Sequence, residues 1–195
     1  MVNIGFIVEG DSEKIVVDSS KFREFITSCG LTLTAPVINA TGQGNLRNDH
    51  FKSYINRLRA LNVAKIFVIT DQDRNSDPNV VRNPIQDADV DGFITYIFVA
   101  NMALESWFLA DSAAMSHWLG VPRFRDNAPE TGATMPWDRL GNMVGVRGPS
   151  KPVFARNFVE NHGFSIVNAA MHGACPSASE MVTYLTAMAP PAPEV

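Results

Sequence analysis

Three short, mostly apolar runs of residues constrain the fold of this chain more than any other feature. They cover residues 4–8, 66–70 and 94–99, and polar residues bound each of them. Runs of this length without polar alternation are typical of strands that are covered on both faces, as in a parallel sheet. Helical patterns separate the runs. We therefore expect an α/β fold with right-handed crossovers and a mainly parallel sheet of about four strands flanked by helices.

Acidic residues follow each of the three runs. Parallel strands end at the same edge of a sheet, and open α/β sheets bind ligands beyond that edge, so we expect these carboxylates to gather there. A cluster of like charges is costly unless a cation neutralises it, and carboxylates are typical ligands of Mg²⁺. The sequence therefore predicts a site for Mg²⁺ or Mn²⁺, with enough acids for two ions about 4 Å apart. The candidate metal ligands are Glu9, Glu13, Asp71, Asp73 and Glu105.

Each acid also has a purely structural interpretation. Glu13 would lie at the start of a helix, where an acid commonly complements the helix dipole. Asp71 and Asp73 are separated by one residue, a spacing that is also common in turns. Glu105 is the most unusual of the set, because the sequence around it is strongly apolar and a buried charge needs a partner. The combination is more specific than any of its members.

The remaining pattern predicts how the chain is organised. We expect residues 1–119 to form the α/β domain and residues 120–195 to form a C-terminal helical extension packed on it. Residues 42–45 are predicted to be a plain glycine-rich loop, because they lack the Gly-Lys-Ser/Thr ending of a P-loop. Periodicity predicts a further strand over 31–39, and helices over 12–29, 46–61, 79–88, 103–119, 152–161 and 177–188.

Composition excludes several classes of protein. The net charge is −4, so binding to nucleic acid would need a local basic patch or a bound metal. Cys29 and Cys175 are far apart and the four histidines are scattered, which argues against a zinc site and favours reduced thiols. No apolar run is long enough to span a bilayer and no signal peptide is recognisable. We expect a cytoplasmic protein with no membrane partner, as a monomer or an oligomer.

A basic, turn-rich segment near residue 150 supplies one more candidate. Lys151 could stabilise the charge that develops on a phosphate, or it could be a solvated loop lysine. Arg147 and Arg156 are weaker candidates for phosphate contacts, and Arg74 could touch a substrate or pair with an acid. The candidate catalytic residues are Glu9, Asp71, Asp73 and Lys151.

Three motifs together resemble the TOPRIM domain. They are Val8-Glu9-Gly10-x-Ser12-Glu13, Asp71-x-Asp73, and a third that runs from Glu105 through Trp107-Phe108-Leu109-Ala110 to Asp111. The similarity is closest to stand-alone bacterial TOPRIM-like proteins related to the nuclease domain of the overcoming-lysogenization-defect (OLD) family, and it covers residues 1–119 best. The resemblance implies that Glu9, Asp71 and Asp73 are the core metal ligands and that Glu13 and Glu105 are additional ones.

Three functions remain open at this point. The first is a divalent-metal-dependent nuclease that acts on DNA or RNA, in phage defence. The second is a metal-binding regulatory or interaction subunit that works with a partner ATPase, since the chain has no ATPase of its own. The third is a Mg²⁺-dependent phosphatase or phosphotransferase with Asp71 as nucleophile, in which Glu9 and Glu13 would be surplus.

Overall fold

A single parallel sheet forms the centre of the protein. The computed structural model describes residues 1–34, 36–144 and 150–189. Its strands are β1 (Val2–Val8), β2 (Leu31–Leu33), β3 (Ile38–Asn39), β4 (Lys65–Asp71) and β5 (Ile94–Ala100). They are ordered β2-β1-β4-β5, β3 also pairs with β1, and every pairing is parallel. The predicted α/β class with a parallel sheet is confirmed.

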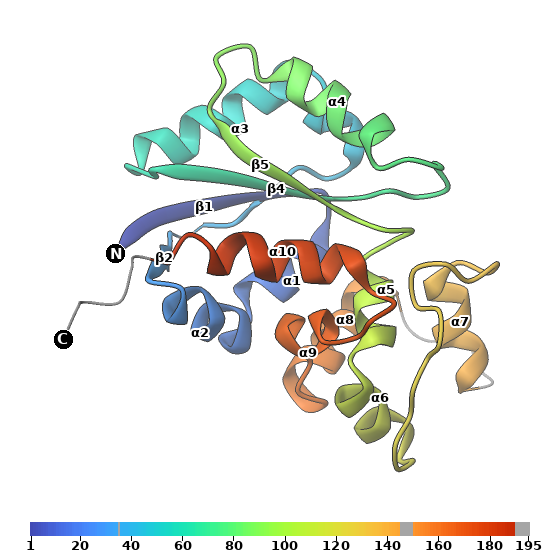
Figure 1. Ribbon diagram of the computed structural model, residues 1–195. Helices are drawn as coiled ribbons and strands as arrows, with labels where there is room; N and C mark the ends of the chain where they lie inside the picture. Colours follow the sequence, from blue (N-terminus) through green and yellow to red (C-terminus); the bar gives the residue numbers. More distant parts are fainter. Residues whose placement is uncertain (35, 145–149, 190–195) are drawn as a thin grey trace.

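Both faces of the sheet are covered, which explains the unbroken apolar runs. Helices α3 (Asp49–Ala60) and α4 (Asn79–Ala88) lie on one face, and α1 (Asp11–Asp18), α2 (Ser20–Ser28) and α10 (Pro176–Thr186) lie on the other (Figure 1). Alternate residues of each strand face opposite layers. Phe6 and Phe67 belong to the core beneath α10, whereas their neighbours Ile7 and Val68 belong to the core beneath α3.

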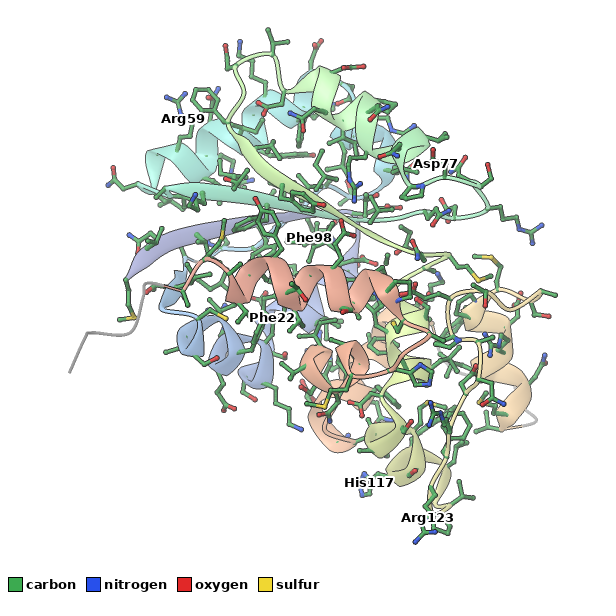
Figure 2. The ribbon with its side chains drawn as sticks, in the orientation of Figure 1. Phe22, Arg59, Asp77, Phe98, His117 and Arg123 are labelled. Atoms are coloured by element: carbon green, nitrogen blue, oxygen red, sulfur yellow. The ribbon has the colours of Figure 1, made fainter. Side chains whose placement is uncertain are left out.

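The C-terminal part of the chain forms a helical layer on the α10 side. Tyr184 of α10 stacks on Tyr96 of β5 with ring centroids 4.2 Å apart, and Phe98 lies in the same layer (Figure 2). Further helices extend this layer beyond the carboxyl edge of the sheet. They are α5 (Glu105–Ala110), α6 (Ser112–Leu119), α7 (Pro136–Met143), α8 (Lys151–Asn161) and α9 (Ile166–Ala170).

Several predicted elements are interrupted. The helix predicted over 12–29 breaks at Ser19, whose extended backbone and side chain cap α2. The strand predicted over 31–39 is divided into β2 and β3, with Pro36, which has no backbone donor, in the gap. Residues 43–45, predicted to be plain loop, form a short 3₁₀ helix together with Leu46, and α3 begins only at Asp49. Helices α7 and α9 were not predicted.

Asp111 explains why the helix predicted over 103–119 is divided in two. The side chain is fully buried, and Oδ1 accepts hydrogen bonds from the amides of Ala113 and Ala114 at the start of α6. Oδ2 accepts from the amide of Ser165, just before α9, at 2.9 Å. The last acid of the third motif is therefore a helix cap that also holds α9 in place.

Within the described ranges, no helix combines the length and the apolar character that a bilayer crossing requires.

Replacing Asp111 tests its structural role. Asp111→Ala removes a helix cap and leaves the amide of the half-buried Ser165 without its acceptor, so the free energy of unfolding should fall by about 2–4 kcal/mol. Urea denaturation measures this change, with Asp87→Asn on the exposed face of α4 as control. A loss below about 0.5 kcal/mol, the range of ordinary surface substitutions, would contradict this role.

Candidate metal centre

At the carboxyl edge of the sheet, a left-handed residue follows each of three strands. Thr41, Asp73 and Met102 have φ values of 57°, 55° and 61°. Each lies two residues beyond the end of its strand, which is β3, β4 or β5. Left-handed conformations are uncommon for residues other than glycine, and such residues gather at functional sites. The shared turn shapes the edge that carries the candidate residues.

Glu9 links β1 to β4. Its amide donates to the carbonyl of Ile69 at 3.0 Å, so the chain still follows the sheet at this residue. Its Oε2 accepts from the Thr70 hydroxyl at 2.5 Å and from the Asp71 amide at 3.1 Å. Its carbonyl accepts from the amide of Gly42 at 2.8 Å. These contacts fix the half-buried Glu9 carboxylate beside the end of β4.

Asp71 connects the end of β4 to the start of α5. Its Oδ1 accepts from the Leu104 amide at 2.9 Å, and only 8% of Asp71 is exposed. Leu104 directly precedes Glu105, the first residue of α5, which is 1% exposed. Asp71 therefore positions the turn that brings Glu105 to the edge.

Glu13 reaches the same place from the first turn of α1. It is 6% exposed, and a Cβ on Gly10 would lie 3.0 Å from its Oε2. Gly10 thus leaves space for the carboxylate to fold back toward the end of β1. This arrangement explains why a glycine follows Glu9 in the first motif.

The four carboxylates interact electrostatically. The pKa of Glu13 is raised to about 7. Burial is the largest cause, and the charges of Glu9 and Glu105 add to it. Burial also raises the pKa of Asp71 well above its usual range, and Glu13, Glu105 and Glu9 add to this effect. We call Glu9, Glu13, Asp71 and Glu105 the acidic cluster, since each contributes to the raised pKa of Glu13 or Asp71 or has a raised pKa itself.

Lys151 counters this charge. It is the first residue of α8, and its Nζ lies 3.1 Å from Oε2 of Glu105. Burial lowers the pKa of Lys151, but Glu105, Asp71 and Glu13 outweigh burial and the pKa is raised. Lys151 is therefore an ammonium ion at neutral pH, and it belongs to the site rather than to a solvated loop.

Asp73 differs from the acidic cluster in its exposure. Its side chain lies on the surface and makes no hydrogen bond or ion pair with another described residue, and its role as a cation ligand stays a prediction. Arg74 is exposed next to it, and Arg156 lies 3.9 Å from Glu160 on α8. Arg147 lies outside the described residues.

The donor chemistry of the acidic cluster suits a hard divalent cation. All of its candidate ligands are carboxylate oxygens, the type that Mg²⁺ and Mn²⁺ prefer. Glu9 Oε1 and Asp71 Oδ2 accept no hydrogen bond from any described residue. Among residues 1–34, 36–144 and 150–189, however, no three His, Cys, Asp or Glu side chains already form a coordination geometry. Cation binding would therefore require the carboxylates to converge and Glu105 to release Lys151.

Sequence reasoning missed the groups that hold the acids. Thr70 is fully buried between Glu9 and Gln43, and Gln43 Nε2 donates to the Asp71 carbonyl at 2.9 Å. The only signal was a threonine at the end of an otherwise apolar strand. Glycine-rich residues 42–45 are thus a support for the end of β4.

A second buried acid was also missed. Glu130 is 4% exposed and accepts from the Ser177 hydroxyl at 2.5 Å, from Asn101 Nδ2 at 2.6 Å and from the Cys175 thiol at 3.0 Å. Burial, followed by Glu130, strongly raises the pKa of Cys175, so its thiol stays protonated. These hydrogen bonds join the segment before α7 to α10 and the end of β5.

Comparisons with known proteins give no independent assignment. Neither models of protein families, nor curated proteins, nor solved structures gave a match to this chain. The resemblance to TOPRIM proteins stays a prediction from the three motifs.

The pKa of Glu13 predicts how pH changes the stability of the cation-free protein. Its folded pKa of about 7 lies above its ordinary value of 4.5. The folded protein thus holds this proton more tightly, and the stabilisation is complete below about pH 4.5 and lost as pH rises through 7. In EDTA at pH 8, Glu13→Gln should therefore raise the melting temperature by roughly 5 °C.

The pH dependence separates this effect from ordinary packing. Near pH 4.5 the two proteins should melt at similar temperatures, and Glu24→Gln on the exposed face of α2 should change neither value. A lower melting temperature of Glu13→Gln at pH 8 would show that the ionised carboxylate is not destabilising.

Proposed function

We propose that this protein is a divalent-cation-dependent nuclease of the TOPRIM type that hydrolyses phosphodiester bonds of DNA or RNA. The observation that carries the proposal is the acidic cluster at the carboxyl edge of a parallel sheet, with Lys151 beside it. Such an edge is where open α/β sheets bind ligands. The three motifs that resemble TOPRIM proteins contribute Glu9, Glu13, Asp71 and Glu105 to the cluster.

These four residues would hold one cation or two. When bound, Mg²⁺ or Mn²⁺ would supply a Lewis acid for the phosphate and would make a nearby water more acidic. Glu9 is the best-oriented ligand, because Thr70 and the Asp71 amide fix one of its oxygens. The Asp71 carboxylate is also oriented, because its Oδ1 accepts a hydrogen bond from the Leu104 amide.

Lys151 has two roles in this proposal. In the structure its ammonium group neutralises Glu105, which is otherwise buried among like charges. When a cation engages Glu105, Lys151 becomes available to face the phosphate, where its charge stabilises the transition state. The lysine side chain is 43% exposed, so a substrate can reach it.

The position of Asp71 favours a nuclease over a phosphotransferase that uses this aspartate as nucleophile. One oxygen accepts from a backbone amide, and the residue is almost fully buried. A nucleophilic carboxylate must be free to reach the phosphorus atom. A role in phage defence and a partner ATPase stay predictions from the resemblance.

Substitutions in the acidic cluster test the proposed activity. With Mg²⁺ or Mn²⁺, the protein should cleave single-stranded or duplex nucleic acid, and Asp71→Asn or Glu9→Gln should lower the rate by at least about 100-fold through weaker charge stabilisation. Lys151→Met should lower it by about tenfold or more. Gel assays of labelled DNA and RNA measure these rates, and circular dichroism checks that each variant folds.

Asp87→Asn is the matched control, since Asp87 is an exposed acid of α4 outside the acidic cluster. Its rate should equal that of the unmodified protein. Cleavage that survives in Asp71→Asn, or that persists in EDTA, would overturn the proposal.

A further inference from the structure

A hollow of about 580 Å³ lies beside the acidic cluster. Its walls are the loop over 72–78, the turn at Asn101 and Met102, and part of the segment over 130–135. Asp77 marks the first of these loops in Figure 2, above the end of the sheet. The volume is within the range of about 300–1,000 Å³ that is usual for small-molecule pockets.

Some residues that line the hollow lie next to the acidic cluster along the chain. Gln72 and Asp73 directly follow Asp71, and the Gln72 amide donates to the Ala100 carbonyl at the end of β5 at 2.9 Å. Met102 lies two residues before Leu104, whose amide holds Asp71. A molecule whose phosphate reaches the acidic cluster can therefore extend into the hollow.

The polar side chains that line the hollow differ in how many hydrogen bonds they make within the described part of the protein. Glu130 is occupied by the hydroxyl and amide of Ser177, by Asn101 and by Cys175. In contrast, the side chains of Asp73 and Arg74 are exposed and make no hydrogen bond or ion pair with any other described residue. One carboxylate and one guanidinium are thus free to bind a ligand.

Apolar side chains complete the hollow. Pro78, Met102 and Met135 line it together with the polar groups. Met102 is kept there by a left-handed backbone, with φ of 61°. Flat apolar rings bind well between such side chains, and proteins hold unstacked bases in this way.

We propose that this hollow binds one unpaired nucleotide next to the scissile phosphate, and that the substrate is single-stranded nucleic acid. Arg74 binds the phosphate of that nucleotide, and Asp73 accepts a hydrogen bond from the amino group of its base. The base lies against Met102. This inference rests on the proposed nuclease function and assigns Asp73 to the substrate rather than to the cation.

The shape of the hollow selects single strands. Bases in a duplex are stacked and paired, so one of them could enter only after it leaves the helix, which costs a few kcal/mol. A single strand avoids this cost. Asp73 would favour bases with an exocyclic amino group, which are adenine, cytosine and guanine, over thymine and uracil.

Arg74→Gln tests the phosphate contact without depending on cleavage. Fluorescence anisotropy of labelled 12-nucleotide DNA is measured with Ca²⁺ in place of Mg²⁺. Single-stranded DNA should bind at least about tenfold more tightly than the duplex of the same sequence, and Arg74→Gln should weaken single-strand binding by about tenfold. Arg57→Gln, an exposed arginine of α3 outside the hollow, should change the affinity less than twofold. Equal loss in the two variants, or preference for the duplex, would overturn the inference.

Asp73→Asn tests the base contact. We expect the preference for oligo(dC) over oligo(dT) to fall by about tenfold, whereas the Mn²⁺ affinity measured by calorimetry stays within twofold. A tenfold loss of Mn²⁺ affinity would make Asp73 a cation ligand and overturn the base contact.

These outcomes separate the hollow from the nuclease activity. Binding that depends on Arg74 and Asp73 without any cleavage would refute the proposed function and keep the hollow as a nucleotide site. Cleavage that is insensitive to both substitutions would keep the proposed function and refute the hollow as a nucleotide site.

Discussion

The repulsion among four carboxylates at one sheet edge is the constraint on which the rest of the site depends. Glu9 directly follows β1, whereas Glu13, Asp71 and Glu105 belong to α1, β4 and α5, and burial raises the pKa of Glu13 and of Asp71. Lys151 reduces the repulsion and comes from α8, far along the chain. The C-terminal helices therefore bring a positive charge to this edge, in addition to the apolar core that they share with the sheet.

Backbone amides hold the edge together against this repulsion. The amide of Asp71 holds Glu9, the amide of Leu104 holds Asp71, and the amide of Gly42 holds the Glu9 carbonyl. These hydrogen bonds fix one oxygen of Glu9 and one of Asp71 at the edge, whereas their other oxygens must still converge on a cation. Two buried acids outside the site, Asp111 and Glu130, anchor the helical layer in the same manner. Acidic side chains thus both build the site and support it.

The sequence predicted the sheet well because its strands are buried on both faces, and it led us to look for the acids at one edge because parallel strands end there. It did not predict the breaks at Ser19 and Asp111, since both depend on side-chain caps within otherwise continuous helical patterns. It placed Asp73 with Asp71 by spacing alone. Asp73 adopts a left-handed backbone conformation and lines the hollow, and nothing in the local sequence indicates that turn.

The most direct test of the metal centre is a crystal structure of the protein soaked in Mn²⁺, with data collected at the manganese absorption edge. We expect anomalous density among Glu9, Glu13, Asp71 and Glu105, at roughly 2.0–2.6 Å from their oxygens, with Lys151 moved away from Glu105. Density at Asp73 alone, or a site without density whose carboxylates keep the positions described, would contradict it.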